Sequence, residues 1–188
     1  KPNRFAQALV TKITNQVNYV SQIIEMGDYT FINQDFKETL KFINSEDLVY
    51  CDPPYIGRHV DYFDSWSEEE EIQLHKGLET AESKYVLSTW LSNKYRINEY
   101  VFSVWQDCNV LTKEHFYHVG GKEKNRNAVY EALLTNFSVE ESLSTDTILE
   151  KIKNGDSPLT SVTDGDDDHQ QLVLKLEERI LRYRVTNQ

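Results

Sequence analysis

The chain has 188 residues, enough for one domain with a sizeable core, and its 39% hydrophobic and 12% aromatic content is ordinary for a globular protein. The sequence holds no apolar run of membrane-span length and does not open with a signal-peptide pattern, so we expect a cytoplasmic protein. A net charge of −11 excludes a surface that is basic all over, the usual footprint of a nucleic-acid-binding domain. The charge is unevenly spread, with −6 in residues 1–138 and −5 in residues 139–188.

Helices and strands are predicted to alternate at the start of the chain. Apolar residues recur at helical spacing over residues 5–25, which predicts a helix with one buried stripe that covers a sheet. Short apolar runs at 29–32 and 48–50 predict buried strands, with a helix near 36–43 between them. Such a β-α-β unit predicts parallel strands.

The second of these strands runs into the sequence Asp52-Pro53-Pro54-Tyr55. Two consecutive prolines cannot continue a helix or a strand ladder, so the chain must turn here, and the turn must be rigid. It presents a carboxylate, a carbonyl and an aromatic ring in a fixed relation. A carboxylate and a carbonyl can accept both N–H bonds of a base amino group while the ring stacks on the base. The simpler interpretation, a turn that only ends a strand, stays open.

The middle of the chain contains clear element signals. Ser67 precedes four glutamates, a combination typical of a capped helix start, and the helix should run to about Thr80. A strand over 85–90 and a short helix near 93–103 follow. The segments 108–119 and 128–136 then predict an antiparallel hairpin, joined by the polar residues 120–126.

The two cysteines, Cys51 and Cys108, lack a Cys-x-x-Cys partner, so we expect free thiols rather than a disulfide framework or a zinc site. Residues 139–170 are rich in Ser, Thr, Asp and Gly and predict an acidic linker with at most one short helix, near 147–153. Within the linker, three alternating aspartates resemble the start of a calcium loop, but His169 replaces the required glycine, so we expect no metal. Residues 171–188 predict an amphipathic helix that packs on the body or docks a partner.

Over residues 1–138 the chain resembles the Dam-like (alpha-class) adenine-N6 DNA methyltransferases. In that class Asp-Pro-Pro-Tyr is the catalytic motif, and a strand ending in Asn-x-Asp-Phe precedes it, as Asn33-Gln34-Asp35-Phe36 does here. The resemblance continues through residues 84–90 and through the Thr-Asn-aromatic ending at 135–137.

The resemblance implies an α/β fold: the Rossmann-like sheet of S-adenosylmethionine-dependent methyltransferases, with an antiparallel hairpin at its end. It also implies S-adenosylmethionine as cofactor and double-stranded DNA as substrate. The family holds the methionine end of its cofactor with a glycine-rich loop after the first strand, and none of the seven glycines forms such a loop here. We therefore expect residues 1–138 to be the catalytic half of the domain, without its first strands. An amino-terminal segment or a separate subunit would then carry the glycine-rich loop and the target-recognition region.

By the same resemblance, Asp52, Pro53, Pro54 and Tyr55 are the catalytic residues, and Asp52, Asp35 and the Phe36 backbone contact the cofactor. Asp35 as a helix cap and Phe36 as a core residue remain alternatives. Basic residues near this edge and in the hairpin loop are the candidate DNA contacts, together with Tyr55: Arg58, Lys122, Lys124 and Arg126. Tyr62, Phe63 and Trp66 frame a flipped base or belong to the core.

The function predicted from the sequence is site-specific methylation of adenine N6 in a flipped base, within a restriction-modification system. Methylation of cytosine N4 or of an RNA base amine is the nearest enzymatic alternative. The non-enzymatic alternative is a subunit or fragment that supplies only the edge of the sheet with the catalytic motif and is not active by itself.

Overall fold

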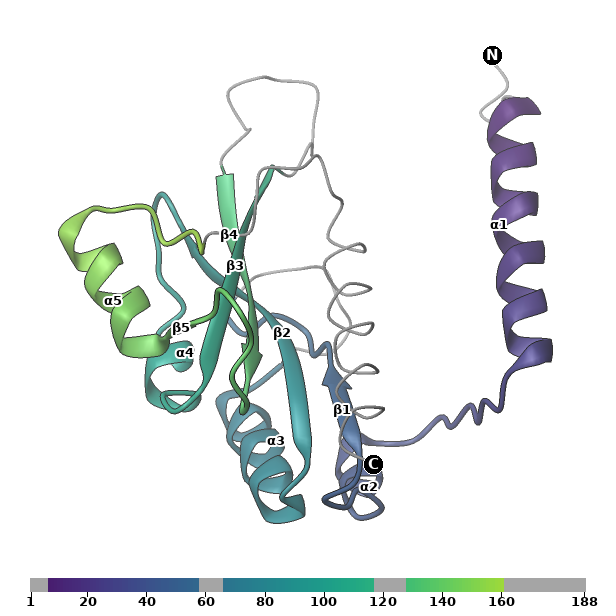
Figure 1. Ribbon diagram of the computed structural model, residues 1–188, viewed down its shortest axis with the longest axis horizontal. Helices are drawn as coiled ribbons and strands as arrows, with labels where there is room; N and C mark the ends of the chain where they lie inside the picture. Colours follow the sequence, from purple (N-terminus) through teal and green to yellow (C-terminus); the bar gives the residue numbers. More distant parts are fainter. Residues whose placement is uncertain (1–6, 58–65, 117–127, 161–188) are drawn as a thin grey trace. The chain divides into compact units, whose positions relative to one another are not determined.

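The computed structural model describes residues 7–57, 66–116 and 128–160 of the chain (Figure 1). The chain divides into two compact units, Lys1–Asp35 and Phe36–Gln188, and each is considered by itself. None of the helices in the described parts is long and apolar enough to cross a membrane.

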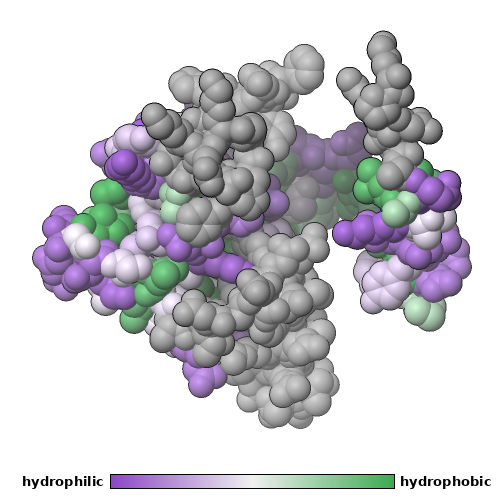
Figure 2. Space-filling view, turned by 90° about the horizontal axis from the view of Figure 1, so that it is seen from above, coloured by the Kyte–Doolittle hydropathy of each residue, from purple (hydrophilic) through white to green (hydrophobic). Residues whose placement is uncertain are grey.

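The first unit contains a long helix, α1 (Gln7–Met26), which confirms the helix predicted over residues 5–25. Within its own unit the apolar stripe is not covered, since no residue of α1 is buried and Val17 is 61% exposed. Green hydrophobic side chains accordingly show on the helix surface beside purple hydrophilic ones in Figure 2. A single helix has no neighbour within its own unit that could cover such a stripe.

The strand predicted over residues 29–32 does not form, and Phe31 is 75% exposed. A strand is held by hydrogen bonds to a neighbouring strand. The described residues of this unit, 7–35, contain no strand with which residues 29–32 could pair. The segment has the composition of a strand but lacks a partner. The β-α-β unit predicted around residues 36–43 is therefore absent.

The second unit is a mixed α/β fold built on a five-stranded sheet with the order β1-β2-β4-β3-β5. The elements follow the chain as α2 (Phe36–Leu40), β1 (Leu48–Cys51), α3 (Glu68–Ala81), β2 (Lys84–Asn93), α4 (Tyr100–Ser103), β3 (Asn109–Phe116), β4 (Ala128–Thr135), β5 (Leu143–Ser144) and α5 (Thr145–Asn154).

Parallel pairing occurs between β1 and β2, with Val49 opposite Tyr85, and α3 forms the connection between them. The start of α3 follows from its sequence. Ser67 accepts a hydrogen bond from the Glu70 backbone at 3.2 Å, and the Glu70 carboxylate accepts one from the Ser67 backbone at 2.8 Å. This capping box satisfies two backbone donors that a helix start leaves without partners, and it confirms the helix start predicted at Ser67.

The hairpin predicted over 108–119 and 128–136 is confirmed by β3 and β4, which pair antiparallel from Asn109–Thr135 to Phe116–Ala128. β4 also pairs antiparallel with β2, so it lies between the two. The Asn136 side chain joins β4 to the start of β2, since it accepts from Tyr85 N at 3.0 Å and donates to Ser83 O at 2.8 Å.

The main core lies where α3, α4 and α5 pack on one face of this sheet (Figure 1). Side chains alternate between the two faces of a strand, so every second residue of β2 contributes to this layer. Its fully buried members include Leu78 of α3, Leu87 and Leu91 of β2, Trp105 after α4, and Ile148 of α5.

Residues 143–160 also belong to this packed structure. β5 pairs with β3, and Ile148 of α5 is fully buried, so the helix predicted near 147–153 forms and contributes to the core. Beyond it, Thr112 of β3 donates to Pro158 O at 2.7 Å and accepts from Thr160 N at 2.9 Å. The stretch expected to be a linker is therefore folded onto the sheet as far as residue 160. The aspartates of the rejected calcium loop and the helix expected over 171–188 lie outside the described residues.

Candidate active site at the end of β1

The Asp-Pro-Pro-Tyr sequence forms a turn directly after β1, which ends at Cys51. Asp52 and Pro54 are exposed, Pro53 and Tyr55 are half-buried, and Ile56 is buried. The turn ends at Gly57, whose φ of +70° lies in the left-handed region that favours glycine. The chain thus presents one carboxylate and one aromatic ring at the carboxyl end of a strand.

The neighbouring strand β2 contacts this turn with two alternate residues. The Tyr55 hydroxyl lies 3.5 Å from Ser88 Oγ, and the indole of Trp90 donates a hydrogen bond to the Ile56 carbonyl at 2.8 Å. Ser88 and Trp90 are both buried. They share one face of β2 because their positions differ by two.

The loop after β2 adds a third contact. The Arg96 guanidinium donates to the Gly57 carbonyl at 2.9 Å and lies 5.5 Å from the centre of the Trp90 ring. Asn93 fixes this loop, since its side-chain oxygen accepts from Tyr95 N at 2.8 Å and from Arg96 N at 3.0 Å. Arg96 and Trp90 thus bind the carbonyls of two consecutive turn residues.

Sequence reasoning missed Ser88, Trp90 and Arg96 as neighbours of the turn. The one available signal was the alternation of Ser88 and Trp90 in a strand expected to lie beside the motif strand. No sequence pattern identified Arg96, because its contact depends on how the loop folds after Asn93.

Of the residues predicted to contact a cofactor, Asp35 ends the first unit and is exposed, whereas Phe36 begins α2. The Phe36 ring is half-buried and lies 5.1 Å from the Trp66 ring. Trp66 in turn donates to the Glu71 carboxylate. Trp66 and the ring of Phe36 therefore pack against the main core. For both side chains, a place in the core was the alternative to a role in binding.

The predicted DNA contacts other than Tyr55 lie outside the described residues, as do Tyr62 and Phe63. These DNA contacts are Arg58, Lys122, Lys124 and Arg126.

A buried carboxylate holds Trp66, which lies just before α3. Glu71 is 2% exposed, and its two oxygens accept from two indoles, Trp66 and Trp105, the latter at 2.7 Å. A buried carboxylate is tolerated when its oxygens are hydrogen-bonded in this way. Glu71 also lies in the first turn of α3, where the helix dipole stabilises negative charge. Its role in this structure is to fix the start of α3.

Both cysteines are free, as expected, and both are poor nucleophiles. Burial raises the pKa of Cys51, next to Asp52, from 9.0 to about 12. Burial likewise raises the pKa of Cys108 to about 11, although its 3.2 Å hydrogen bond with the Tyr85 hydroxyl lowers that pKa in part. The thiolate is the reactive species. Both thiols therefore stay protonated, and unreactive, to well above neutral pH.

We expect the folded protein to react slowly with a disulfide-type thiol reagent at pH 8. Burial keeps the Cys51 thiol protonated, because its pKa of about 12 lies far above the pH of the assay. The measurement is the rate of thiol release with and without denaturant, in wild type and in Cys51→Ser. A native Cys51 that reacts as fast as the unfolded chain would contradict this assignment.

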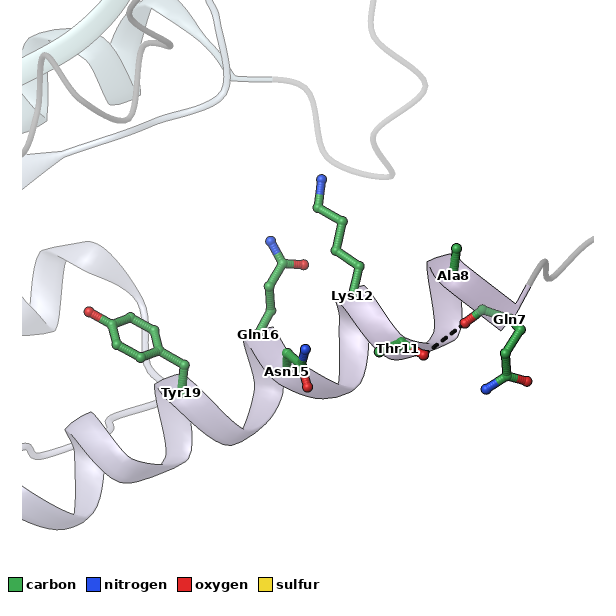
Figure 3. A pocket seen from close by; sticks show the side chains of 7 residues that line it. All are labelled: Gln7, Ala8, Thr11, Lys12, Asn15, Gln16 and Tyr19. Carbon is green, nitrogen blue, oxygen red and sulfur yellow. Dashed lines mark hydrogen bonds between the residues drawn. The ribbon is translucent and has the colours of Figure 1, made fainter.

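A hollow on the first unit has no features of a binding site. All of its lining residues come from α1, from Gln7 to Tyr19, and the one hydrogen bond drawn among them joins Thr11 to the Gln7 carbonyl (Figure 3). The surface of a single helix cannot enclose a ligand. The turn after β1 is therefore the better candidate.

Comparison with known proteins agrees with this choice. The model of a family described as D12 class N6 adenine-specific DNA methyltransferase matches residues 4–119, which include the whole turn. The chain is 28% identical over 146 residues to the type II methyltransferase M.FokI of Planomicrobium okeanokoites, covering 72% of this chain and 22% of that protein. It is 41% identical over 56 residues to the retron Ec67 DNA adenine methylase of Escherichia coli, covering 29% of this chain and 20% of that protein.

The chain thus spans about a fifth of the length of each of these two relatives. The family match nevertheless covers more than half of the chain and contains the strand β1, its turn and the bracing strand β2. The chain belongs to the D12 class N6 adenine-specific DNA methyltransferase family.

Proposed function

We propose that this chain provides the catalytic edge of an adenine-N6 DNA methyltransferase. The observation that carries the proposal is the turn after β1, which holds an exposed carboxylate at Asp52 and a half-buried ring at Tyr55. The family match and the printed names of both relatives support the same reaction.

The exocyclic amine of adenine is a poor nucleophile because its lone pair is delocalised into the ring. The Asp52 carboxylate and the Pro53 carbonyl would accept its two N–H groups, which favours a pyramidal nitrogen with a directed lone pair. Proline suits this role because Pro54 has no N–H and the two rings restrict the backbone. The target base must leave the duplex to reach the turn, and Tyr55 offers a surface on which it can stack.

The family implies S-adenosylmethionine, which would supply the methyl group. The residues present fit the adenine end of that molecule. Asp35 is an exposed carboxylate that can accept hydrogen bonds, and Phe36 has a half-buried aromatic ring beside its backbone N–H. The sheet of the second unit would then be the carboxyl half of a Rossmann-like methyltransferase sheet.

Cofactor and DNA binding would also draw on an amino-terminal segment or subunit with the glycine-rich loop and the target-recognition region. Two facts support this. The chain matches about a fifth of each relative, and the sequence contains no Gly-x-Gly. Within this chain, the residues that would contact double-stranded DNA are Tyr55, Arg58, Lys122, Lys124 and Arg126. The enzyme would act in a restriction-modification system.

The test is a transfer assay with methyl-labelled cofactor and mixed-sequence duplex DNA, followed by digestion to nucleosides. The protein is used in the complete form in which it is expressed naturally. We expect the label in N6-methyladenine. Label in N4-methylcytosine, or only in RNA added as a second substrate, would replace the proposal with one of its alternatives, and no transfer at all would reject it.

A further inference from the structure

We propose that Trp90 and Arg96 are positioning residues that hold the Asp-Pro-Pro-Tyr turn from its carboxyl side. The inference rests on the proposed function only for its kinetic consequence. Its structural part concerns the carbonyls of Ile56 and Gly57, which directly follow Tyr55.

The front of the turn is stiff because of its two prolines, but its rear contains no such residue. Ile56 and Gly57 could adopt other backbone angles, Gly57 most of all. In the structure, each of their carbonyls accepts one hydrogen bond from a side chain distant in sequence: from Trp90 at 2.8 Å and from Arg96 at 2.9 Å. The rear of the turn is thus fixed by the two donors rather than by its own sequence.

The two donors also support each other. The Arg96 guanidinium lies over the Trp90 ring at 5.5 Å from its centre, a cation–π arrangement. Trp90 is 3% exposed, so its hydrogen bond is shielded from water, and losing the donor would leave a buried carbonyl without its partner. Trp90 therefore makes the larger contribution, and Arg96, which is exposed, the smaller one.

The strand that carries Trp90 is irregular at this point. The pairing of β2 with β4 shifts between Trp90 and Ser92, where Leu91 is the extra residue of a bulge. A bulge changes the direction of nearby side chains and is common beside active sites. The indole reaches the turn directly next to this irregularity.

Catalysis by this turn would depend on the exact placement of Asp52, the Pro53 carbonyl and Tyr55. Small misplacements of reacting groups lower turnover strongly, by about a hundredfold for 1 Å. Trp90 and Arg96 would act through Tyr55 without touching substrate. Their loss is expected to lower kcat more than it changes KM for the cofactor.

The chain provides a matched control in Trp105. Its indole is also buried and also donates one hydrogen bond, to Glu71 at 2.7 Å, and it lies in the main core with Leu78 and Ile148. Trp90→Phe and Trp105→Phe each remove one buried indole N–H. For Arg96→Ala, the control is Lys94→Ala, which removes the same charge from an exposed neighbour in the loop.

Two measurements on the complete protein test the inference. The first is hydrogen exchange at the amides of residues 55–57, which we expect to be faster in Trp90→Phe than in Trp105→Phe. The second is single-turnover methyl transfer, in which we expect Trp90→Phe to lose about 10- to 100-fold in rate, and Arg96→Ala less, with both controls near wild type. Equal exchange in the two tryptophan variants would overturn the positioning role, and so would equal rates if the wild-type protein is active. Exchange requires no turnover, so an inactive wild-type protein would reject the proposed function while exchange alone decides the positioning role.

Discussion

Replacing Asp52 by alanine should abolish methyl transfer while leaving the fold intact. The carboxylate is exposed at the end of β1 and is the charged acceptor of the turn, so its removal affects the transition state more than the folded state. The loss of a charged group aligned with the reacting atoms typically lowers kcat by about 10²–10³ or more. Asp52→Asn should be similarly damaging, because an amide places its own N–H donors against those of the base. The measurement is single-turnover transfer with melting temperature as the check on folding.

Glu150→Ala is the matched control for Asp52→Ala. It removes an exposed carboxylate from α5, which packs beside β5 and β3 at the edge of the sheet opposite β1. This variant should retain wild-type turnover. Near-normal turnover of Asp52→Ala under the same conditions would remove the central claim of the proposed mechanism.

Two substitutions of Tyr55 should distinguish the role of its ring from the role of its hydroxyl. Tyr55→Ala removes the stacking surface, which is worth about 1–3 kcal/mol per base, or about 5- to 150-fold in kcat/KM for DNA. Tyr55→Phe retains the ring and loses only the 3.5 Å contact with Ser88 Oγ, which is long for a hydrogen bond. The phenylalanine variant should therefore keep most of the activity.

Ser88→Ala tests the second half of that interpretation, because it removes the same contact from the other side. Its activity should match that of Tyr55→Phe. If the alanine and phenylalanine variants of Tyr55 are equally active, the base does not stack on this residue.

Elements with strong local signals were predictable from the sequence. Ser67 and the acidic residues that follow it located the start of α3, and the two prolines located the end of β1. The hairpin was predictable because β-branched and apolar residues fill both strands and a polar loop joins them. In each case the signal lies in the residue types of a short, continuous stretch of the sequence.

Predictions that needed a distant partner were less successful. The stripe of α1 and the expected strand at 29–32 both have the right composition, but neither finds a partner within its unit. The opposite error occurred at 143–160. The polar composition of this stretch suggested a linker, yet Ile148 and Thr160 are buried by contacts with distant strands.

The candidate site shows the same division. The motif itself identified the turn with its carboxylate and its ring. Trp90 and Arg96 could not be found in this way, because they reach the turn only after β2 pairs beside β1 and the loop at Asn93 folds. Sequence reasoning therefore located the turn that carries the candidate reactive groups but missed the side chains that contact it.

The position of β4 between β2 and β3 has a consequence during protein synthesis. While the ribosome makes residues 1–127, β2 lacks one of its two neighbours, and β3 lacks the long strand on which it will pair. Unpaired strand edges of this kind can pair with other chains. The nascent protein thus carries unpaired edges on β2 and β3 until residues 128–135 have emerged, and a product released before that point would be a candidate for aggregation or for rescue by chaperones.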